Sequence, residues 1–164
     1  TGIQASGETF ADNDTSLMTS AAIQNKIQAS VPNLYDNTIK LLPSDFMGND
    51  EGGVTKTIQF VDNDASGLKP GNADTELLAF VSIPQGMSID KVDVYAGGAF
   101  AVDVIQMNVN ASNGDLSGSS IGTGNCNTQV ECTNTASTAT NYFMIQVTTT
   151  ATGHRVYGGL VTIV

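Results

Sequence analysis

Seven short segments between residues 38 and 164 are rich in Val, Ile, Thr, Phe and Tyr, and Gly, Pro, Asn and Asp separate them. Runs of this composition, bounded by turn-forming residues, are typical of β-strands joined by tight turns. Several such strands predict two sheets packed face to face, that is, an antiparallel, jelly-roll-like β-sandwich in a mainly β protein. The segments are TIKLL (38–42), VTKTIQFV (54–61), ELLAFVSI (76–83), KVDVYA (91–96), AFAVDVIQMNV (99–109), NYFMIQVTTT (141–150) and RVYGGLVTIV (155–164).

The order of side chains within these segments indicates which of them face a core. Aromatic or β-branched residues occupy every second position from Phe143 to Val147, a period typical of a strand with one buried face. In AFAVDVIQMNV the apolar phase shifts by one residue between Val104 and Ile105. Because an extra residue moves all later side chains to the other face unless a β-bulge absorbs it, we expect a bulge there. The Gly-Gly pair that begins at Gly158 predicts a bend or a close backbone approach.

One amphipathic helix is predicted near the N-terminus, over the sequence DNDTSLMTSAAIQNKI (12–27). Acidic and hydroxyl residues at its start can cap the first turn, and Pro32 ends the helical pattern. A helix of about four turns is marginal alone in water, so its apolar face needs a partner, either the β domain or the same helix of other copies. The sequence therefore predicts an extended segment and a connector helix in residues 1–36, followed by a β-sandwich in residues 37–164. The predicted helix face consists of Leu17, Ala21, Ile23, Ile27 and Val31.

The sequence ASGETFADNDTSLMTSAAIQNKI (5–27) resembles the short connector of tail fibres and other fibrous structural proteins of tailed bacteriophages, especially marine ones. In those proteins a D-[DN]-x-[ST]-L-M-T-x-x-A-I segment precedes a new fibre module. Such connectors lie in trimeric fibres, where three helices can pack about one axis. The matching residues, within about a seventh of the chain, are Asp12, Asn13, Asp14, Ser16, Leu17, Met18, Thr19, Ala22 and Ile23.

The resemblance implies a structural virion protein of a tailed phage, fibre-like or knob-like and trimeric. Such a protein is assembled in the host cytoplasm, joins other virion proteins, and displays loops for adhesion to a host-surface glycan or protein. A second hypothesis is a head-decoration or capsid-fibre protein that clamps neighbouring capsomers, and the docking position of the N-terminal segment separates the two. A third is a secreted carbohydrate-binding module or glycosidase, which requires a concave aromatic groove with two close carboxylates.

Charge and the scarcity of catalytic residue types narrow the classes of function. The 164 residues include 16 acidic and 6 basic ones, for a formal net charge of −10, so little cationic surface is available to bind nucleic acid. No apolar run reaches the length of a membrane span. His154 is the single histidine, and no nucleophile-elbow motif or Lys-bearing phosphate loop accompanies it. We therefore expect no enzymatic activity, no cofactor, no nucleic-acid binding and no membrane insertion.

The most metal-like stretch is DNDASG (62–67), which matches the first half of an EF-hand loop with Asp62 and Asp64 as oxygen ligands. The second half of the loop lacks the bidentate Glu that calcium requires. We therefore interpret the stretch as an Asx-rich turn and expect no metal, with a calcium site of another kind as the alternative.

Two cysteines, Cys126 and Cys132, lie in a polar loop with five residues between them. A disulfide closing this ring would stabilise the fold by about 2–2.5 kcal/mol on the chain-entropy model. Two free thiols are the alternative, and a metal pair would need further Cys or His residues nearby.

The segment from residue 110 to residue 141 is long and almost free of apolar residues, and long loops in compact domains are usually functional or disordered. We expect it to form two short hairpins or lobes that project into solvent from one end of the sandwich. Tyr95, Tyr142 and Tyr157 are candidates for stacking on a sugar, with a core or strand-face role as the alternative. Candidate receptor contacts in the loop are Ser112, Asn113, Asp115, Asn127, Gln129 and Asn134.

Overall fold

The computed structural model describes residues 2–4, 16–18, 23, 37–49, 58–61, 67–109 and 118–164. The chain divides into two compact units, Thr1–Asn37 and Thr38–Val164. In the part of the chain that is described, no helix has the length and apolarity needed to cross a bilayer.

In the first unit, β1 (Gly2–Gln4) pairs with β2 (Ser16–Met18) as parallel strands. This pairing corrects the predicted helix, because residues 16–18, including Leu17, are extended, while Ile23 is helical. A short helix gains little stability without a packing partner, and pairing with β1 satisfies backbone groups by another route. The helical connector and its trimer contact stay a prediction, because the other residues of the predicted face lie outside the described ones; these are Ala21, Ile27 and Val31.

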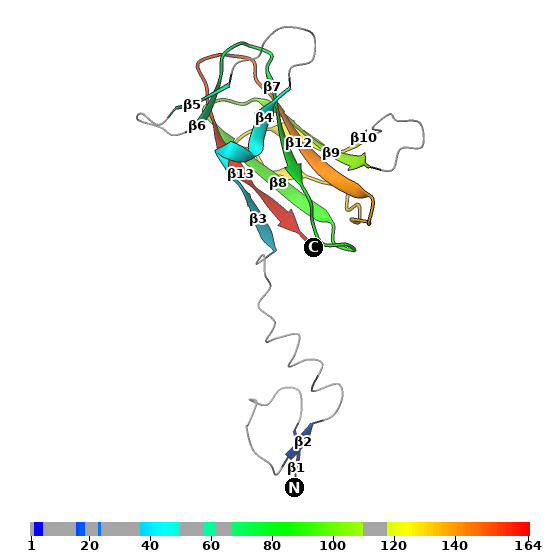
Figure 1. The fold of residues 1–164 in the computed structure, drawn as a ribbon. Helices are drawn as coiled ribbons and strands as arrows, with labels where there is room; N and C mark the ends of the chain where they lie inside the picture. Colours follow the sequence, from blue (N-terminus) through cyan, green and yellow to red (C-terminus); the bar gives the residue numbers. More distant parts are fainter. Residues whose placement is uncertain are drawn as a thin grey trace. The chain divides into compact units, whose positions relative to one another are not determined.

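The second unit is a β-sandwich of two antiparallel sheets, which confirms the predicted fold class (Figure 1). One sheet has five strands in the order β10-β9-β12-β7-β4; they are β4 (Phe46–Gly48), β7 (Glu76–Val81), β9 (Ala101–Asn108), β10 (Gly118–Asn125) and β12 (Asn141–Thr148). The six-stranded sheet has the order β11-β8-β13-β6-β5, and β3 also pairs with β13. Its strands are β3 (Thr38–Leu41), β5 (Ile58–Val61), β6 (Gly67–Pro70), β8 (Ile89–Ala96), β11 (Val130–Glu131) and β13 (Val156–Ile163). A 3-10 helix, η1 (Pro43–Asp45), precedes β4.

All seven strands predicted from the sequence are present, as β3, β5, β7, β8, β9, β12 and β13. Four further strands, β4, β6, β10 and β11, were not predicted because they are short or rich in Gly and Ser. Strand β10 (GSSIGTGN) corrects the prediction of a displayed loop over residues 110–141. It is an eight-residue edge strand hydrogen-bonded to β9, and five of its eight residues are Gly or Ser, which weaken the strand signal of Ile121 and Thr123.

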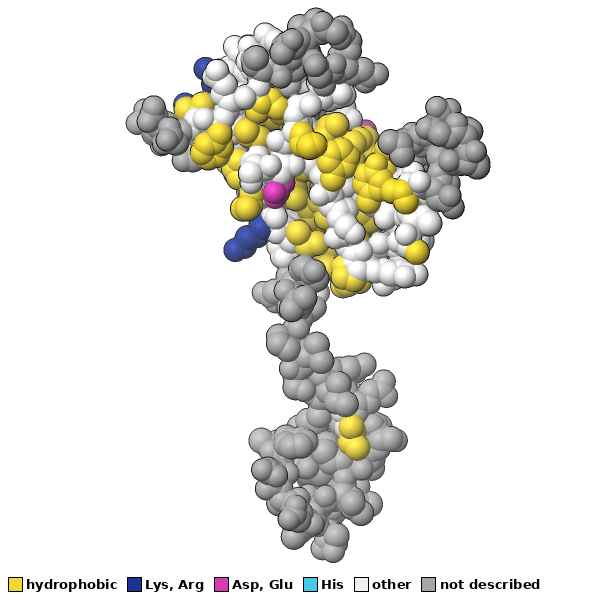
Figure 2. Space-filling view, in the orientation of Figure 1, with side chains coloured by type: hydrophobic (Ala, Val, Ile, Leu, Met, Phe, Trp, Pro, Cys, Tyr) yellow, Lys and Arg dark blue, Asp and Glu magenta, His cyan; other side chains and the backbone are white. Residues whose placement is uncertain are grey.

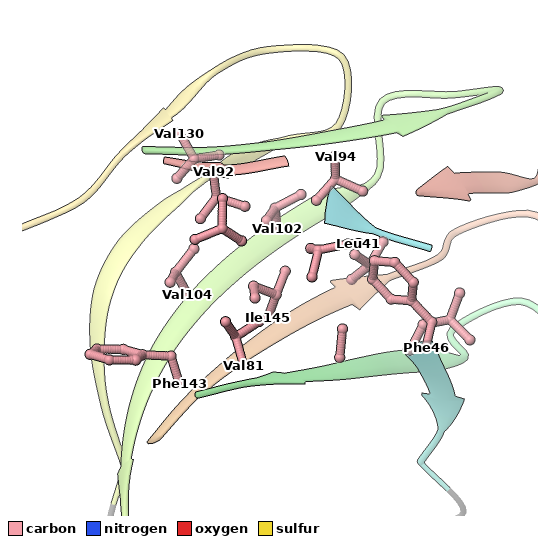
Figure 3. Close-up of a cluster of buried hydrophobic side chains, with 14 of the residues drawn as sticks. Leu41, Phe46, Val81, Val92, Val94, Val102, Val104, Val130, Phe143 and Ile145 are labelled. Carbon is pink, nitrogen blue, oxygen red and sulfur yellow. The ribbon is translucent and has the colours of Figure 1, made fainter. Parts of the chain in front are cut away.

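The core lies between the inner faces of the two sheets (Figure 3). On β12, the side chains of Phe143, Ile145 and Val147 are 0% exposed, which confirms the predicted alternation. Val92 and Val94 of β8 enter the same core from the opposite sheet. Burial of each such side chain stabilises the fold by about 1.5–3 kcal/mol relative to its exposure, and so the inner faces hold the two sheets together.

The predicted bulge beside Val104 and Ile105 is present, but its extra residue belongs to the neighbouring strand. Strand β9 pairs with β12 along its whole length without a shift. On its other side, Ser120 pairs with Ile105 and Gly122 with Val104, so Ile121 is the extra residue of β10 and pairs with no residue of β9. A central strand is paired on both sides, whereas an edge strand can accommodate the extra residue without breaking a second ladder.

The predicted close backbone approach at Gly158 is confirmed. The φ angle of Gly158 is +126°, which side-chain-bearing residues rarely adopt, and a Cβ atom there would lie 2.5 Å from the carbonyl oxygen of Leu41. The register of β13 against β8 shifts at this point, between Val156, which pairs with Ala96, and Gly158, which pairs with Tyr95. Strand β13 therefore bulges where it passes from β6 to β3.

Candidate functional site

Two tyrosines lie next to each other on the outer face of the six-stranded sheet. Tyr95 of β8 is 45% exposed and Tyr157 of β13 is 41% exposed, so both have the strand-face position that was part of the alternative, and their stacking on a sugar stays a prediction. Tyr157 is the extra residue of the β13 bulge, and it opposes Tyr95 together with Gly158. We call Tyr95 and Tyr157 the tyrosine pair.

Glycines make room for the ring of Tyr157. A Cβ atom at Gly67 of β6 would lie 2.9 Å from Cδ1 of Tyr157, and one at Gly97 would lie 3.3 Å from its hydroxyl oxygen. The ring therefore extends from β6 across to the turn that follows β8. Larger residues at either glycine would displace the ring, so these two distant positions must be small for Tyr157 to lie here.

The turn after β8 is held by the side chain of Asn127. Its Oδ1 accepts a hydrogen bond from the N–H of Ala96 at 3.0 Å, and its Nδ2 donates to the carbonyl oxygens of Ala96 at 2.8 Å and Gly98 at 3.4 Å. Asn127 has a φ of 63°, a conformation that Asn adopts more readily than most residues. Asn127 is exposed, and its amide is hydrogen-bonded within the chain, where it positions the turn beside the tyrosine pair. Its predicted role as a receptor contact stays a prediction.

His154 and Arg155 border the same turn on the β13 side. The N–H of Gly97 donates to the carbonyl oxygen of Arg155 at 2.8 Å, and a Cβ atom at Gly98 would overlap with the ring of His154. The ring centroid of His154 lies 5.6 Å from that of Phe100. His154 thus packs against an aromatic ring and a glycine at the rim of the candidate site.

The charged residues around the tyrosine pair have both signs. Lys91 Nζ lies 3.8 Å from Glu131 Oε1, a surface pair that contributes about 1 kcal/mol or less. In the row of side chains next to the tyrosine pair, the strand register places Lys40 on one side of Leu160 and Asp93 on the other. All the basic side chains in the described part of the chain belong to this sheet or to the segment that leads into β13; they are Lys40, Lys69, Lys91 and Arg155.

Few of the other predicted site residues join this cluster. Tyr142 lies on the five-stranded sheet, with its ring centroid 5.9 Å from that of Phe80. Gln129 and Asn134 are exposed, and their receptor role stays a prediction. Among the residues with described positions, no group of three His, Cys, Asp or Glu side chains could hold a metal ion. The remaining candidates lie outside the described residues; they are Ser112, Asn113, Asp115, Asp62 and Asp64.

Cys126 and Cys132 are both free thiols, so the alternative to the predicted disulfide is correct. A Cβ atom at Gly122 of β10 would lie 3.3 Å from Cα of Cys132, whereas Cys126 follows four positions after Gly122. At about 3.3 Å per residue, the two cysteines are held farther apart than the ~7 Å that a disulfide spans between Cα atoms. Burial raises the pKa of each thiol to about 11, and the charges of Asp90 and Glu131 add to the rise at Cys132.

Sequence reasoning named the two tyrosines but not the residues that position them. Gly67, Gly97 and His154 approach the tyrosine pair or its turn only because distant segments fold together. Tyr95 and Tyr157 are themselves neighbours only through the pairing of β8 with β13. In the sequence, the Gly-Gly pairs that begin at Gly97 and Gly158 were the one signal that the backbones of these two segments approach other parts of the chain closely.

No family model matches the chain, and no curated protein matches it. Among solved structures, the chain is similar to the high-resolution crystallographic structure of the CBM22-1 and GH10 modules of the Clostridium thermocellum N-terminal endo-1,4-beta-D-xylanase 10B, complexed with xylohexaose. The two chains share 12% sequence identity with a TM-score of 0.48, and the match covers 76% of this chain and 27% of that chain. Similarity at this level does not indicate a shared ligand.

Proposed function

We propose that this chain is a structural virion protein of a tailed phage, fibre-like or knob-like, whose β-sandwich adheres to a host-surface glycan through the tyrosine pair. The similarity of residues 5–27 to fibre connectors supports the virion role. The observation that carries the adhesive role is the placement of Tyr95 and Tyr157, half-exposed and adjacent on a hydrogen-bonded sheet. The proposed role is binding without catalysis.

The chemistry of the tyrosine pair supports a sugar as the ligand. A sugar ring has a face of C–H groups and an edge of hydroxyls, so it can pack on an aromatic side chain while its edge forms hydrogen bonds. Tyrosine offers an apolar ring and a polar tip for these two kinds of contact. Arg155 lies close to Tyr157, since a Cβ at Gly67 would be 2.9 Å from Cδ1 of Tyr157 and 3.2 Å from Cβ of Arg155.

Adhesion through such an open site depends on several copies binding together. A shallow surface with two aromatic side chains binds one sugar weakly, and a trimer presents three such surfaces. Linking weak sites raises the overall avidity by about 10²–10⁴-fold when the copies engage at the same time. The trimer predicted from the connector would therefore serve both assembly and adhesion.

Retention of the full chain on a panel of immobilised bacterial surface glycans tests the adhesive role. We expect Tyr95→Ala and Tyr157→Ala each to weaken retention on the bound glycan by about tenfold or more, the loss of one well-used contact. Phe60→Ala is the matched control, because Phe60 of β5 is a 58% exposed aromatic strand residue outside the tyrosine pair. Retention that is the same for all four proteins, or lost equally in all three variants, would contradict the proposed site.

Immunogold labelling of purified virions tests the structural role separately. Label at the tail tip supports the fibre or knob, and label over the head supports the alternative of a decoration or capsid-fibre protein. If the protein is absent from purified virions but still binds glycans, it is a carbohydrate-binding module and the virion role is wrong.

A further inference from the structure

The outer face of the five-stranded sheet carries a continuous apolar surface, here called the apolar face. Figure 2 shows hydrophobic side chains gathered over β7 and β12. The register pairs Phe80 of β7 with Met144 of β12, and Met144 with Ile105 of β9, which makes one apolar row across three strands. Neighbouring rows extend it through further apolar residues. The apolar face consists of Met47, Leu78, Phe80, Ile105, Tyr142 and Met144.

Two side chains on this face are strongly exposed in the single chain. Met47 is 52% exposed and Phe80 is 46% exposed. Isolated exposed hydrophobic residues are ordinary on protein surfaces and need no explanation. A contiguous apolar surface differs from them, because it marks a place where another molecule excludes water.

The size of the apolar face suits a contact between proteins. Four strands about 4.8 Å apart and three rows of side chains about 7 Å apart cover about 400 Å². Gln146 and Asp103 occupy the end of one row, so the apolar part is about 300 Å². The largest apolar patches on monomers measure about 300–600 Å² and are often functional. A standard interface buries about 800 Å² per partner, with an apolar centre and a polar rim, so this patch corresponds to the centre of one.

The charges around the apolar face identify the kind of partner. Within the described strands of this sheet, the acids are Glu76 and Asp103, and there is no basic side chain. Neutral donors bind both acids, since Gln146 Nε2 donates to Glu76 at 2.9 Å and Ser120 Oγ donates to Asp103 at 2.5 Å. The centre of the face offers no charge to attract a strongly acidic or a strongly basic surface. A second copy has the same uncharged apolar centre, so a contact between two such faces places no charge against the apolar row. The net charge of −10 on each chain opposes the approach and makes the contact stronger at higher salt.

We propose that the apolar face is the surface through which copies of this chain contact one another about a symmetry axis. Each copy presents its own apolar face to the axis, with the row from Phe80 to Ile105 nearest to it. The tyrosine pair belongs to the other sheet and stays exposed in this arrangement. The proposal goes beyond glycan adhesion and does not depend on it, because the two roles use different outer faces.

The oxidation rate of Met47 in the full chain tests the proposal at the surface itself. Dilute hydrogen peroxide is added at micromolar protein concentration, and mass spectrometry of peptides gives the rate for Met47 in the native and in the urea-unfolded chain. A Met47 side chain that is 52% exposed in separate copies would be oxidised within about twofold of the unfolded rate. If copies cover it, we expect oxidation to be slower by about tenfold or more, because under about a tenth of the copies is then free.

Two variants show whether any protection comes from this contact. Phe80→Glu places a charge at the apolar centre, and we expect it to restore rapid oxidation of Met47. Tyr95→Glu is the matched control, a 45% exposed aromatic residue on the other sheet, and it should leave Met47 protected. Thermal unfolding of both variants confirms that they are folded. Oxidation of Met47 in the wild-type chain at nearly the unfolded rate would overturn the proposal. Copies that associate only through the N-terminal unit would give this same result, because Met47 would stay exposed. Protection that survives in a folded Phe80→Glu variant would overturn it as well.

Discussion

The two outer faces of the sandwich differ in charge, in shape and in the residues they expose. The five-stranded sheet presents the apolar face and, in its described strands, no basic side chain. The six-stranded sheet and the segment leading into β13 carry the described Lys and Arg residues, together with the tyrosine pair on a bulged strand. The inner faces, by contrast, are alike, since both supply Val, Ile and other apolar side chains to one core. The inner faces thus hold the fold together and leave each outer face free to bind a different partner.

The difference depends on the period of two in a β-strand. On β12, Phe143 is fully buried in the core, while the next residue, Met144, belongs to the apolar face. On β8, Val94 is fully buried and Tyr95 is exposed beside Tyr157. Successive side chains of a strand point to opposite faces, so fold and contact surface are encoded at alternate positions of the same segments.

Alanine substitutions at Phe143 and Met144 give the largest contrast, because they compare the two faces of one strand. Phe143→Ala removes a fully buried side chain and leaves a cavity, so we expect the free energy of unfolding to fall by about 3–5 kcal/mol. Met144→Ala should lower it by less than about 1 kcal/mol and weaken association instead. Urea unfolding at a protein concentration low enough to separate the copies measures both. A loss at Met144 as large as that at Phe143 would show that the apolar face is part of the fold.

The reactivity of Cys126 and Cys132 tests the packing of the segment between β10 and β11, where the chain passes from one sheet to the other. Burial raises the pKa of Cys126 and Cys132 from 9.0 to about 11, so at pH 8 about a hundredfold less thiolate is present than in the unfolded chain. We expect alkylation by iodoacetamide at pH 8 to be slower by about the same factor in the folded chain.

The same two pKa values predict how stability depends on pH. Between about pH 9 and pH 11 the folded chain keeps thiol protons that the unfolded chain has lost, so the free energy of unfolding should fall as the pH rises through this range. Urea unfolding over this pH range measures the change. Equal alkylation of folded and unfolded chains, or stability that rises with pH here, would contradict the buried position of the thiols.

A glycine substitution tests the bulge that shapes the six-stranded outer face. Gly158→Ala combines a φ of +126° with a Cβ only 2.5 Å from a carbonyl oxygen, so we expect it to cost about 1–3 kcal/mol and to weaken glycan retention by displacing Tyr157. Gly86→Ala is the matched control, because Gly86 has a φ of +90° with no atom within 4 Å of its Cβ position. Thermal unfolding should show that Gly86→Ala loses less stability than Gly158→Ala, and the smaller loss measures the cost of the backbone angle alone. Equal losses at both glycines would mean that the close approach of β13 to β3 is not structurally important.

Much of the fold could be predicted from sequence, since strands with β-branched and aromatic residues at every second position, such as β12, carry their own signal. Strand β10 was missed, because its five Gly and Ser residues pair through backbone groups and only Ile121 and Thr123 carry a strand signal. Residues 16–18 show the opposite failure, since a helical pattern of apolar residues was outweighed by pairing with residues 2–4. Local sequence is a weak guide where a short segment has a choice of backbone partners.

The candidate site was predictable only in part. Exposed tyrosines could be named, but three of them looked alike in sequence, and the pairing of β8 with β13 joins Tyr95 to Tyr157 while it leaves Tyr142 on the other sheet. Asn127 looked like a displayed polar residue, although its side chain hydrogen-bonds the backbone of a segment 31 residues away. Both differences depend on long-range strand pairing, which residue types and spacing alone do not specify.

In the proposed assembly, copies contact one another through the apolar face while the tyrosine pair stays exposed. The mass in solution as a function of concentration tests this arrangement most directly. Light scattering would compare the wild-type chain with Phe80→Glu and Tyr95→Glu. We predict that the wild type and Tyr95→Glu have the same multiple of the 17.0 kDa single-chain mass, and that Phe80→Glu dissociates at concentrations about thirtyfold higher or more, the effect of losing a central interface residue. A wild-type mass of 17.0 kDa at every concentration, or a loss of mass in Tyr95→Glu as large as that in Phe80→Glu, would contradict the proposed assembly.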